Sequence, residues 1–155
     1  MTRTRSHAFT PEVMKRPTEH SGRAFYKGLL EALVRVMGSS NGYLLDHGPR
    51  VALLGHEIGR EMGLPARELS RILFGGILLD LGMIGLVEDA WENPVPTLSP
   101  SIRTLLEAHP LRSGETVSAI PHLESVAPLV RNHHEWWDGS GYPEGKEGDE
   151  IPVGA

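Results

Sequence analysis

The sequence predicts an all-α bundle of about five or more helices. No stretch alternates apolar and polar residues for long enough to form a strand, whereas apolar residues recur at helical spacing. Glycine and proline divide the chain into segments of helical length. The chain has 155 residues, 39% of them hydrophobic, which suffices for one hydrophobic core. We therefore expect one helical domain over residues 21–155 after a flexible arm over residues 1–20.

The composition disfavours several classes of function. The net charge is −5 at pH 7, so a nucleic-acid polymer is not an expected partner. The chain has no cysteine, which leaves histidines and carboxylates as metal ligands. The most apolar stretch, residues 72–87, is interrupted by Asp80 and is short for a bilayer span. No signal peptide is evident, and we expect a cytoplasmic protein without a membrane partner.

Apolar spacing and capping residues place the first two helices. The first covers about residues 22–38. The second begins with Asp46 as its N-cap and ends near Gly63. His47 shares an apolar stripe of this helix, whereas His56 is half a turn out of phase and should face solvent. The other members of the stripe are Val51, Leu54 and Ile58.

Three later helices carry further residues of metal-ligand type. The third starts near Pro65 and directs Asp80 inward. The fourth has Ser99 as its N-cap and carries His109, after which Pro110 limits the helix. The fifth starts from Ser125 and carries the adjacent pair His133 and His134, and residues 138–152 form a loop.

These residues converge on one interior. Any one buried histidine is more often a hydrogen-bonded core residue than a metal ligand. Several buried imidazoles together with a carboxylate are costly unless they are paired, and one shared divalent cation satisfies all of them. The predicted set is His47, Asp80, His109, His133 and His134.

Four motifs follow one another in a recognisable order. The run from His133 to Pro143 reads HHEWWDGSGYP. Upstream, the sequence has HGPRV from His47, LDLGM from Leu79, and a histidine-proline pair at His109 with Gly114 five residues after that histidine. The run resembles the HHExxDGxGYP signature of the HD-GYP family, and the other three resemble its HxxRV, HDxGK and HPxxG elements. The resemblance covers about residues 43–155 and implies that the helical bundle is HD-domain-like.

The resemblance implies an HD-type phosphodiesterase that hydrolyses cyclic di-GMP with clustered iron or manganese ions, which activate a water molecule. It implies that Asp80 is the bridging, catalytic carboxylate. It also implies that the motif residues bind a nucleotide or a partner, such as a diguanylate-cyclase-type domain that contacts the loop. These residues are Arg50, Asp138, Gly139, Gly141, Tyr142 and Pro143.

The sequence also departs from the family pattern. Leu79 replaces a histidine ligand, Met83 replaces a lysine that contacts the scissile phosphate, and Tyr43 stands where members with a third metal have glutamate. The family supplies a further aspartate and a core helix after the position of Ala155, so the domain is expected to be truncated at that end. We expect at most one divalent transition metal (iron, manganese or zinc), no dinuclear site, and impaired catalysis.

Three functions remain open. The first is a catalytically degenerate module that binds a cyclic dinucleotide or a signalling partner, which we favour. The second is an active phosphohydrolase that uses one metal or ligands from elsewhere in the natural protein. The third is a structural, dimerising domain. We also expect an apolar groove near Leu54, Leu73 and Val130, and a homodimer in which the first helix, with Leu29, packs into such a groove.

Overall fold

Regular structure in the described residues is helical, as the sequence predicts. The computed structural model describes residues 19–86 and 95–155, so the predicted arm lies almost wholly outside the described residues. Within them, an isolated bridge between Asp138 and Glu147 is the only strand-like pairing. The helices are α1 (Glu19–Ser40), α2 (Gly42–Glu61), α3 (Ala66–Leu78), α5 (Pro100–Glu107), α6 (His109–Ser118) and α7 (Ala127–Asn132), and the short 3₁₀ turns are η2 (Leu81–Met83), η3 (Val95–Thr97) and η4 (Gly148–Glu150).

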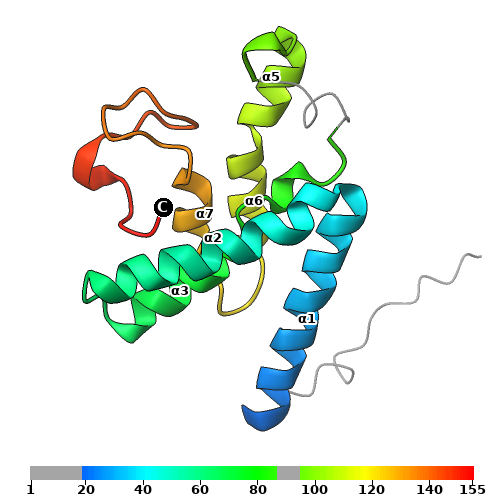
Figure 1. The fold of residues 1–155 in the computed structure, drawn as a ribbon, viewed down its shortest axis with the longest axis vertical. Coiled ribbons are helices and arrows are strands. Elements are labelled where there is room, and N and C mark those ends of the chain that lie inside the picture. Colours follow the sequence, from blue (N-terminus) through cyan, green and yellow to red (C-terminus); the bar gives the residue numbers. More distant parts are fainter. Residues whose placement is uncertain (1–18, 87–94) are drawn as a thin grey trace, which may run out of the picture. The chain divides into compact units, whose positions relative to one another are not determined.

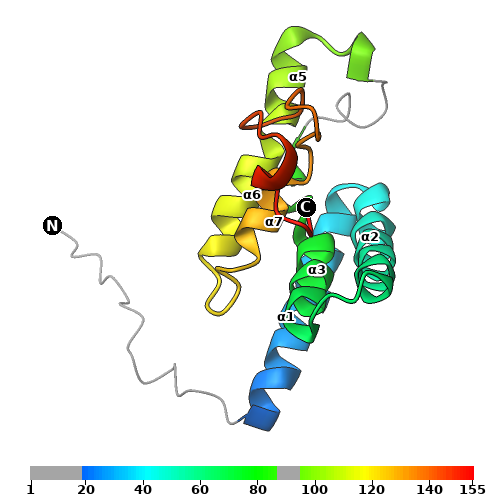
Figure 2. The ribbon, with the colours of Figure 1, turned by 90° about the vertical axis from the view of Figure 1, so that its left-hand side faces the viewer.

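The chain divides into two compact units within α1. One unit ends at Ala32, and the other runs from Leu33 to Ala155 and contains all the predicted site residues. In the second unit α2 packs along α3, α6 packs along α7, and α3 also contacts α7 (Figures 1 and 2). The turn η2, which follows α3, packs against α6. No described helix combines the length and the apolar character needed to cross a membrane.

The start of α2 differs from the sequence prediction. Its N-cap is Asn41, whose side-chain oxygen accepts a hydrogen bond from the backbone N–H of Tyr43 at 2.8 Å. Asp46 therefore lies inside the helix and not at its start. The predicted end near Gly63 is confirmed, because that residue follows the helix with a φ of 72°.

The buried face of α2 also differs from the predicted stripe. Leu54 and Ile58 are 65% and 52% exposed. His56, predicted to face solvent, is half-buried. The buried residues of this helix are mostly small, namely Leu44, Gly48, Ala52 and Gly59.

Close approach of α2 and α3 explains this burial of small residues. A Cβ atom added to Gly76 would lie 2.5 Å from the Cα atom of Ala52, and one added to Gly48 would lie 2.9 Å from the backbone oxygen of Ile77. Larger side chains would clash with backbone atoms, which cannot move away as a flexible side chain can. The two helices therefore form a tight seam, which we call the glycine seam.

The predicted fourth helix is two helices. Ser99 caps α5 by accepting a hydrogen bond from the backbone N–H of Ile102 at 3.4 Å, as expected. α5 ends at Glu107, ahead of Pro110 as expected, but Pro110 also lies in the first turn of α6, where no backbone N–H is required for helical hydrogen bonding. The prediction missed α6 because it read this proline as a stop signal.

The remaining elements complete the core. α3 follows Pro65 as predicted, but Asp80 lies just beyond its end, as the N-cap of η2. α7 ends at Asn132, so His133 is its C-cap. The side chains most completely buried among the apolar residues are Met37, Leu44, Leu78, Val117 and Val130.

Candidate metal centre

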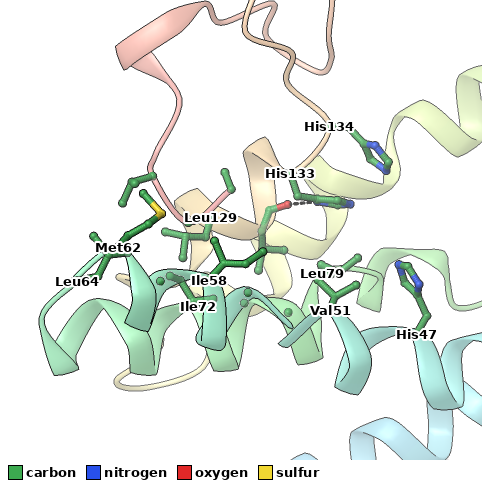
Figure 3. A pocket seen from close by; sticks show the side chains of 18 residues that line it. His47, Val51, Ile58, Met62, Leu64, Ile72, Leu79, Leu129, His133 and His134 are labelled. Carbon is green, nitrogen blue, oxygen red and sulfur yellow. Dashed lines mark hydrogen bonds between the residues drawn. The ribbon is translucent and has the colours of Figure 1, made fainter. Parts of the chain in front are cut away.

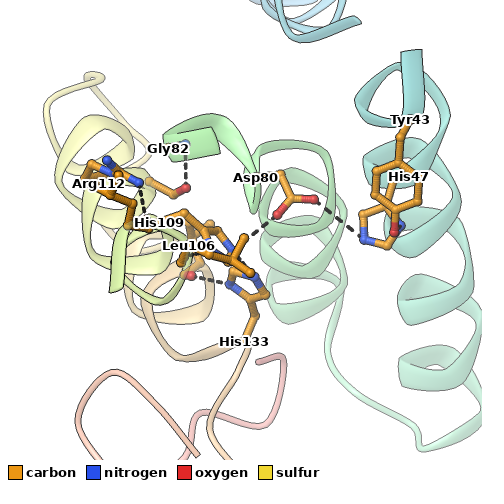
Figure 4. Close-up of polar contacts among 11 residues, drawn as sticks. Tyr43, His47, Asp80, Gly82, Leu106, His109, Arg112 and His133 are labelled. Atoms are coloured by element: carbon orange, nitrogen blue, oxygen red, sulfur yellow. Dashed lines mark hydrogen bonds and ion pairs between the residues drawn. The ribbon is translucent and has the colours of Figure 1, made fainter. Parts of the chain in front are cut away.

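Three helix ends bring the predicted ligands to one region of the second unit. His109 opens α6, His133 and His134 follow α7, and Asp80 follows α3. Ligand atoms of the three histidines all lie within 4.8 Å of one another. The Oδ1 atom of Asp80 lies 3.3 Å from Nε2 of His109 (Figure 4). We call His109, His133 and His134 the histidine cluster.

Backbone carbonyls fix the tautomers of two of these histidines. Nδ1 of His109 donates to the carbonyl oxygen of Leu106 at 2.6 Å, and Nδ1 of His133 donates to that of Val130 at 2.7 Å. A carbonyl oxygen can only accept, so each Nδ1 carries a hydrogen. In the neutral rings, Nε2 is then left with a lone pair. This is the arrangement that orients metal-binding histidines.

The Nε2 atoms of His109 and His133 face one another. The two Nε2 atoms of His109 and His133 are 3.2 Å apart, and the Asp80 carboxylate faces the first of them. Lone pairs that converge in this way repel unless a proton or a cation lies among them. Neutral imidazoles and a carboxylate are the donor set preferred by zinc, iron and manganese. The residues present therefore fit a divalent transition metal.

Burial favours the neutral form of His133 and His134. Desolvation is the main cause that lowers the pKa of His133. Desolvation, followed by the charge of the neighbouring His133, lowers the pKa of His134 to about 3. His109 and Asp80 are 2% and 6% exposed. Protons therefore compete weakly for the ring nitrogen atoms of His133 and His134 at neutral pH.

His47 lies on the other side of Asp80 from the histidine cluster. Its Nε2 is 3.7 Å from Oδ2 of Asp80, which is beyond hydrogen-bond distance. Its Nδ1 is 2.8 Å from the hydroxyl of Tyr43, and the two rings stack with centroids 4.7 Å apart. Asp80 thus lies between His47 and His109, with one oxygen toward each (Figure 4).

Apolar side chains occupy two of the positions that depart from the family pattern. Leu79 and Met83 are each 6% exposed. Neither side chain offers a strong donor for a hard divalent cation or a positive charge for a phosphate. Leu79 and Met83 therefore leave the surroundings of Asp80 without the histidine and the lysine of the family pattern.

A cavity of about 450 Å³ opens beside the histidine cluster, between α2, α3 and α7. Figure 3 shows His47, His133 and His134 at one end and Met62 and Leu64 at the other. Most of the lining is apolar, and none of the described lining residues is lysine or arginine. Of the three residues around which a groove was predicted, Val130 lines the cavity, whereas Leu54 and Leu73 do not.

The predicted binding residues of the loop differ in burial and in their contacts. Tyr142 is half-buried, and its ring stacks on that of His134 with centroids 4.7 Å apart. Burial is the main cause that raises the pKa of Tyr142 to about 12. Asp138 is exposed and accepts hydrogen bonds from the backbone N–H and hydroxyl of Ser140, which lower its pKa.

The other predicted binding residues lie around these. Gly139 has a φ of 77°, and a Cβ atom on Gly141 would lie 2.3 Å from a backbone nitrogen. Pro143 follows Tyr142 and is half-buried. Arg50 is exposed on α2, away from the loop in sequence. Burial raises the pKa of Tyr43, and the positive charge of Arg50 opposes that rise.

One residue near the site received no role from the sequence. Glu135 lies within the HHEWWDGSGYP run, and its two carboxylate oxygens accept hydrogen bonds from the backbone N–H groups of Glu144 and Lys146. The sequence feature that could have indicated this role is a carboxylate immediately before a glycine-rich loop, because the backbone N–H groups of such a loop need acceptors.

Comparison with known proteins gives a family and several relatives. The family described as HD domain matches residues 31–155. The chain is 34% identical to a cyclic di-GMP phosphodiesterase of Thermotoga maritima over 109 residues, which are 69% of this chain and 29% of the relative. It is 27% identical to the cyclic di-GMP phosphodiesterase response regulator RpfG of Xanthomonas campestris pv. campestris over 128 residues, which are 81% of this chain and 34% of that protein.

A third relative has a different nucleotide in its name. The chain is 24% identical to the 3'3'-cGAMP-specific phosphodiesterase 3 of Vibrio cholerae over 130 residues, which are 84% of this chain and 28% of the relative. The chain thus spans about a third or less of the length of these relatives. With the family match over residues 31–155 and the ordered motifs, the chain belongs to the HD domain family and is a member of its HD-GYP group.

Proposed function

We propose that this chain is a degenerate HD-GYP module of cyclic-dinucleotide signalling, which holds one divalent transition metal and acts by binding a nucleotide or a partner. The observation that carries the proposal is the convergence of two Nε2 atoms and the Asp80 carboxylate beside buried Leu79 and Met83. A metal fits the first three groups. The last two residues deprive the site of groups that catalysis would use.

The proposed ligands are Asp80, His109, His133 and His134, with His47 close to Asp80 but not essential. When bound, a divalent metal at these residues would supply Lewis acidity and lower the pKa of a bound water molecule. The protein's own contribution is orientation. The carbonyl oxygens of Leu106 and Val130 hold two imidazole rings with Nε2 toward the site.

Impaired catalysis follows from what surrounds these ligands. A phosphodiester that is being cleaved accumulates negative charge, which cationic and hydrogen-bond donor groups stabilise. Met83 supplies no such charge, and no described residue that lines the cavity is lysine or arginine. Loss of one preorganised donor alone costs about a hundredfold or more in rate.

The relatives support the class of nucleotide. Their names specify cyclic di-GMP and 3'3'-cGAMP, and the proposed ligand for this chain is therefore a cyclic dinucleotide. The loop supports a protein partner as well, such as a diguanylate-cyclase-type domain. Trp136 and Trp137 are 61% and 74% exposed beside this loop, and exposed aromatic residues commonly anchor interfaces.

An active phosphohydrolase is the second candidate. The observation that favours it is the histidine cluster itself, because three imidazoles and Asp80 are together and burial keeps two of the rings neutral. The two candidates agree on the metal and differ on turnover.

Metal content, binding and turnover measured together separate these possibilities. Elemental analysis of the purified chain should give at most one transition metal per chain, and His109→Ala with His133→Ala should remove it. His56→Ala is the matched control, because that histidine contacts Glu57 on α2 and is not part of the cluster. Two metals per chain would contradict the proposal.

The nucleotide experiment uses cyclic di-GMP and 3'3'-cGAMP with added manganese or iron. We expect binding by calorimetry without appreciable linear product. Turnover at an ordinary enzymatic rate would establish the second candidate instead. A chain that holds no metal and binds neither nucleotide would leave the structural, dimerising domain as the function.

A further inference from the structure

Backbone pairing closes the loop that follows the histidine cluster into a compact unit. Asp138 and Glu147 form the isolated bridge at its base, and the backbone N–H of Gly148 donates to the carbonyl oxygen of Trp137 at 3.0 Å. Residues 138–147 therefore form a loop beyond α7 whose two ends meet at this bridge (Figure 1). We call this segment the GYP loop.

Glu135 joins the end of α7 to the returning half of the GYP loop. Its Oε1 accepts a hydrogen bond from the backbone N–H of Glu144 at 2.7 Å, and its Oε2 accepts one from the backbone N–H of Lys146 at 3.0 Å. One half-buried carboxylate thus satisfies two backbone donors two residues apart. Hydrogen bonds to an ionised acceptor are stronger than those between neutral groups.

Side-chain pairs support the same connection. Lys146 Nζ donates to Oδ1 of buried Asn132 at 3.0 Å. Arg131 donates to Glu144 at 2.7 Å. Hydrogen bonds from Lys146 and Arg131 lower the pKa of Glu144. Arg131 and Lys146 are long, partly exposed side chains, and ion pairs of this kind are screened by solvent. Glu135 differs from them because it binds two backbone N–H groups of the loop.

The linked loop carries Tyr142 onto the histidine cluster. The backbone N–H of Tyr142 donates to the carbonyl oxygen of His134 at 3.1 Å, and the two rings stack with an interplanar angle of 19°. Gly141 lies so close to the backbone of residues 134–136 that a Cβ atom there would overlap it. Movement of the loop would therefore move the Tyr142 ring off His134.

We propose that Glu135 is a positioning residue: its carboxylate holds the GYP loop so that the Tyr142 ring keeps His134 in its metal-binding orientation. The proposal rests on the proposed function for its effect on metal binding. The arrangement of Glu135, Tyr142 and His134 itself does not require a metal. Glu135 follows His134 in the chain, but its carboxylate binds N–H groups of the loop, so the effect of the carboxylate on the His134 ring passes through the loop.

The test compares Glu135→Ala and Glu135→Gln with Tyr142→Leu, which removes the ring itself. Glu147→Gln is the matched control, because Glu147 caps η4 in the same segment and does not contact the end of α7 through its side chain. Three quantities are measured on the full chain. They are amide exchange at Glu144 and Lys146, the NMR shift of the His134 ring protons without metal, and the affinity and visible spectrum of bound Co²⁺.

In Glu135→Ala we expect the two amides to lose protection and the His134 ring protons to lose the shift that the stacked tyrosine causes, as in Tyr142→Leu. Co²⁺ should bind about 10-fold more weakly, the lower end of the effect of outer-sphere partners, with an altered spectrum. Glu135→Gln keeps one acceptor oxygen and should be intermediate, which guards against an effect of misfolding. Glu147→Gln should match the parent chain.

The idea is overturned if Glu135→Ala exposes the two amides while the His134 shift stays as in the parent chain. It is also overturned if Glu147→Gln has the same effects as Glu135→Ala. Failure of the proposed function has a different signature. In that case the parent chain binds no Co²⁺, and the ring shift of His134 still decides whether Glu135 positions it.

Discussion

Replacing Gly76 by alanine should destabilise the helical domain by about 2 kcal/mol. The added Cβ atom would lie 2.5 Å from Cα and 2.6 Å from the backbone nitrogen of Ala52. Because both contacts are to backbone, we take the upper end of the usual overpacking cost, about 3 kcal/mol. The better helix propensity of alanine offsets about 1 kcal/mol of this.

Thermal unfolding measures the effect. For a domain of this length, about 2 kcal/mol corresponds to a fall in Tm of about 4–8 °C. Gly42→Ala is the control, because nothing lies within 4 Å of a Cβ atom at that helical position, and its effect should be within about 0.5 kcal/mol. An unchanged or higher Tm for Gly76→Ala would refute the argument that α2 and α3 meet through their backbones.

Three further changes test other parts of the molecule. Ser113→Ala removes a fully buried hydroxyl that accepts a hydrogen bond from the backbone N–H of Gly82 at 2.7 Å, so urea unfolding should show a loss of about 1–3 kcal/mol. Leu79→His with Met83→Lys should raise metal content by elemental analysis before it raises hydrolysis. If the apolar face of α1 mediates self-association, Leu29→Asp should convert a sedimenting dimer to monomer.

For each of these three predictions, one outcome would contradict the reasoning. For Ser113, a loss no larger than that of Ser118→Ala, an exposed serine on the same helix, would mean that the buried hydrogen bond contributes little. For the double variant, the proposal fails if turnover appears without a gain in metal. For Leu29, a parent chain that sediments as a monomer at high concentration rules out the expected homodimer.

The sequence predicted the fold class because helix signals are local. Ser99 and Pro100 gave the start of α5 correctly, and Pro65 gave the start of α3. Pro110 misled because the same residue that prevents a helix from continuing also starts one well. Asn41 was missed as a cap because Asp46 offered the same signal a turn later, and only tertiary packing decides between them.

The sequence also indicated which residues gather at the site, but not how they are arranged. Ordered motifs identified the histidines and Asp80, since their residue types and spacing are visible in one dimension. The orientation of His109 and His133 depends on carbonyl oxygens at the ends of helices, which have no sequence signature. The exposure of Leu54 was missed because the glycine seam buries a different face of α2 than hydrophobicity alone suggests.

The two carbonyl oxygens that fix the histidine tautomers also make the cluster a frustrated part of the fold. Each Nδ1 hydrogen bond satisfies a backbone group near a helix end, and in doing so turns an Nε2 lone pair toward its counterpart 3.2 Å away. The hydrogen bonds at Nδ1 thus stabilise the two rings in an orientation in which their Nε2 lone pairs repel each other. Conflicts of this kind are common at functional sites. A cation that binds the folded chain and not the unfolded one relieves this conflict, and stability should then rise with the logarithm of its concentration. The domain would report metal supply through its own folding equilibrium, whether or not it turns over a nucleotide.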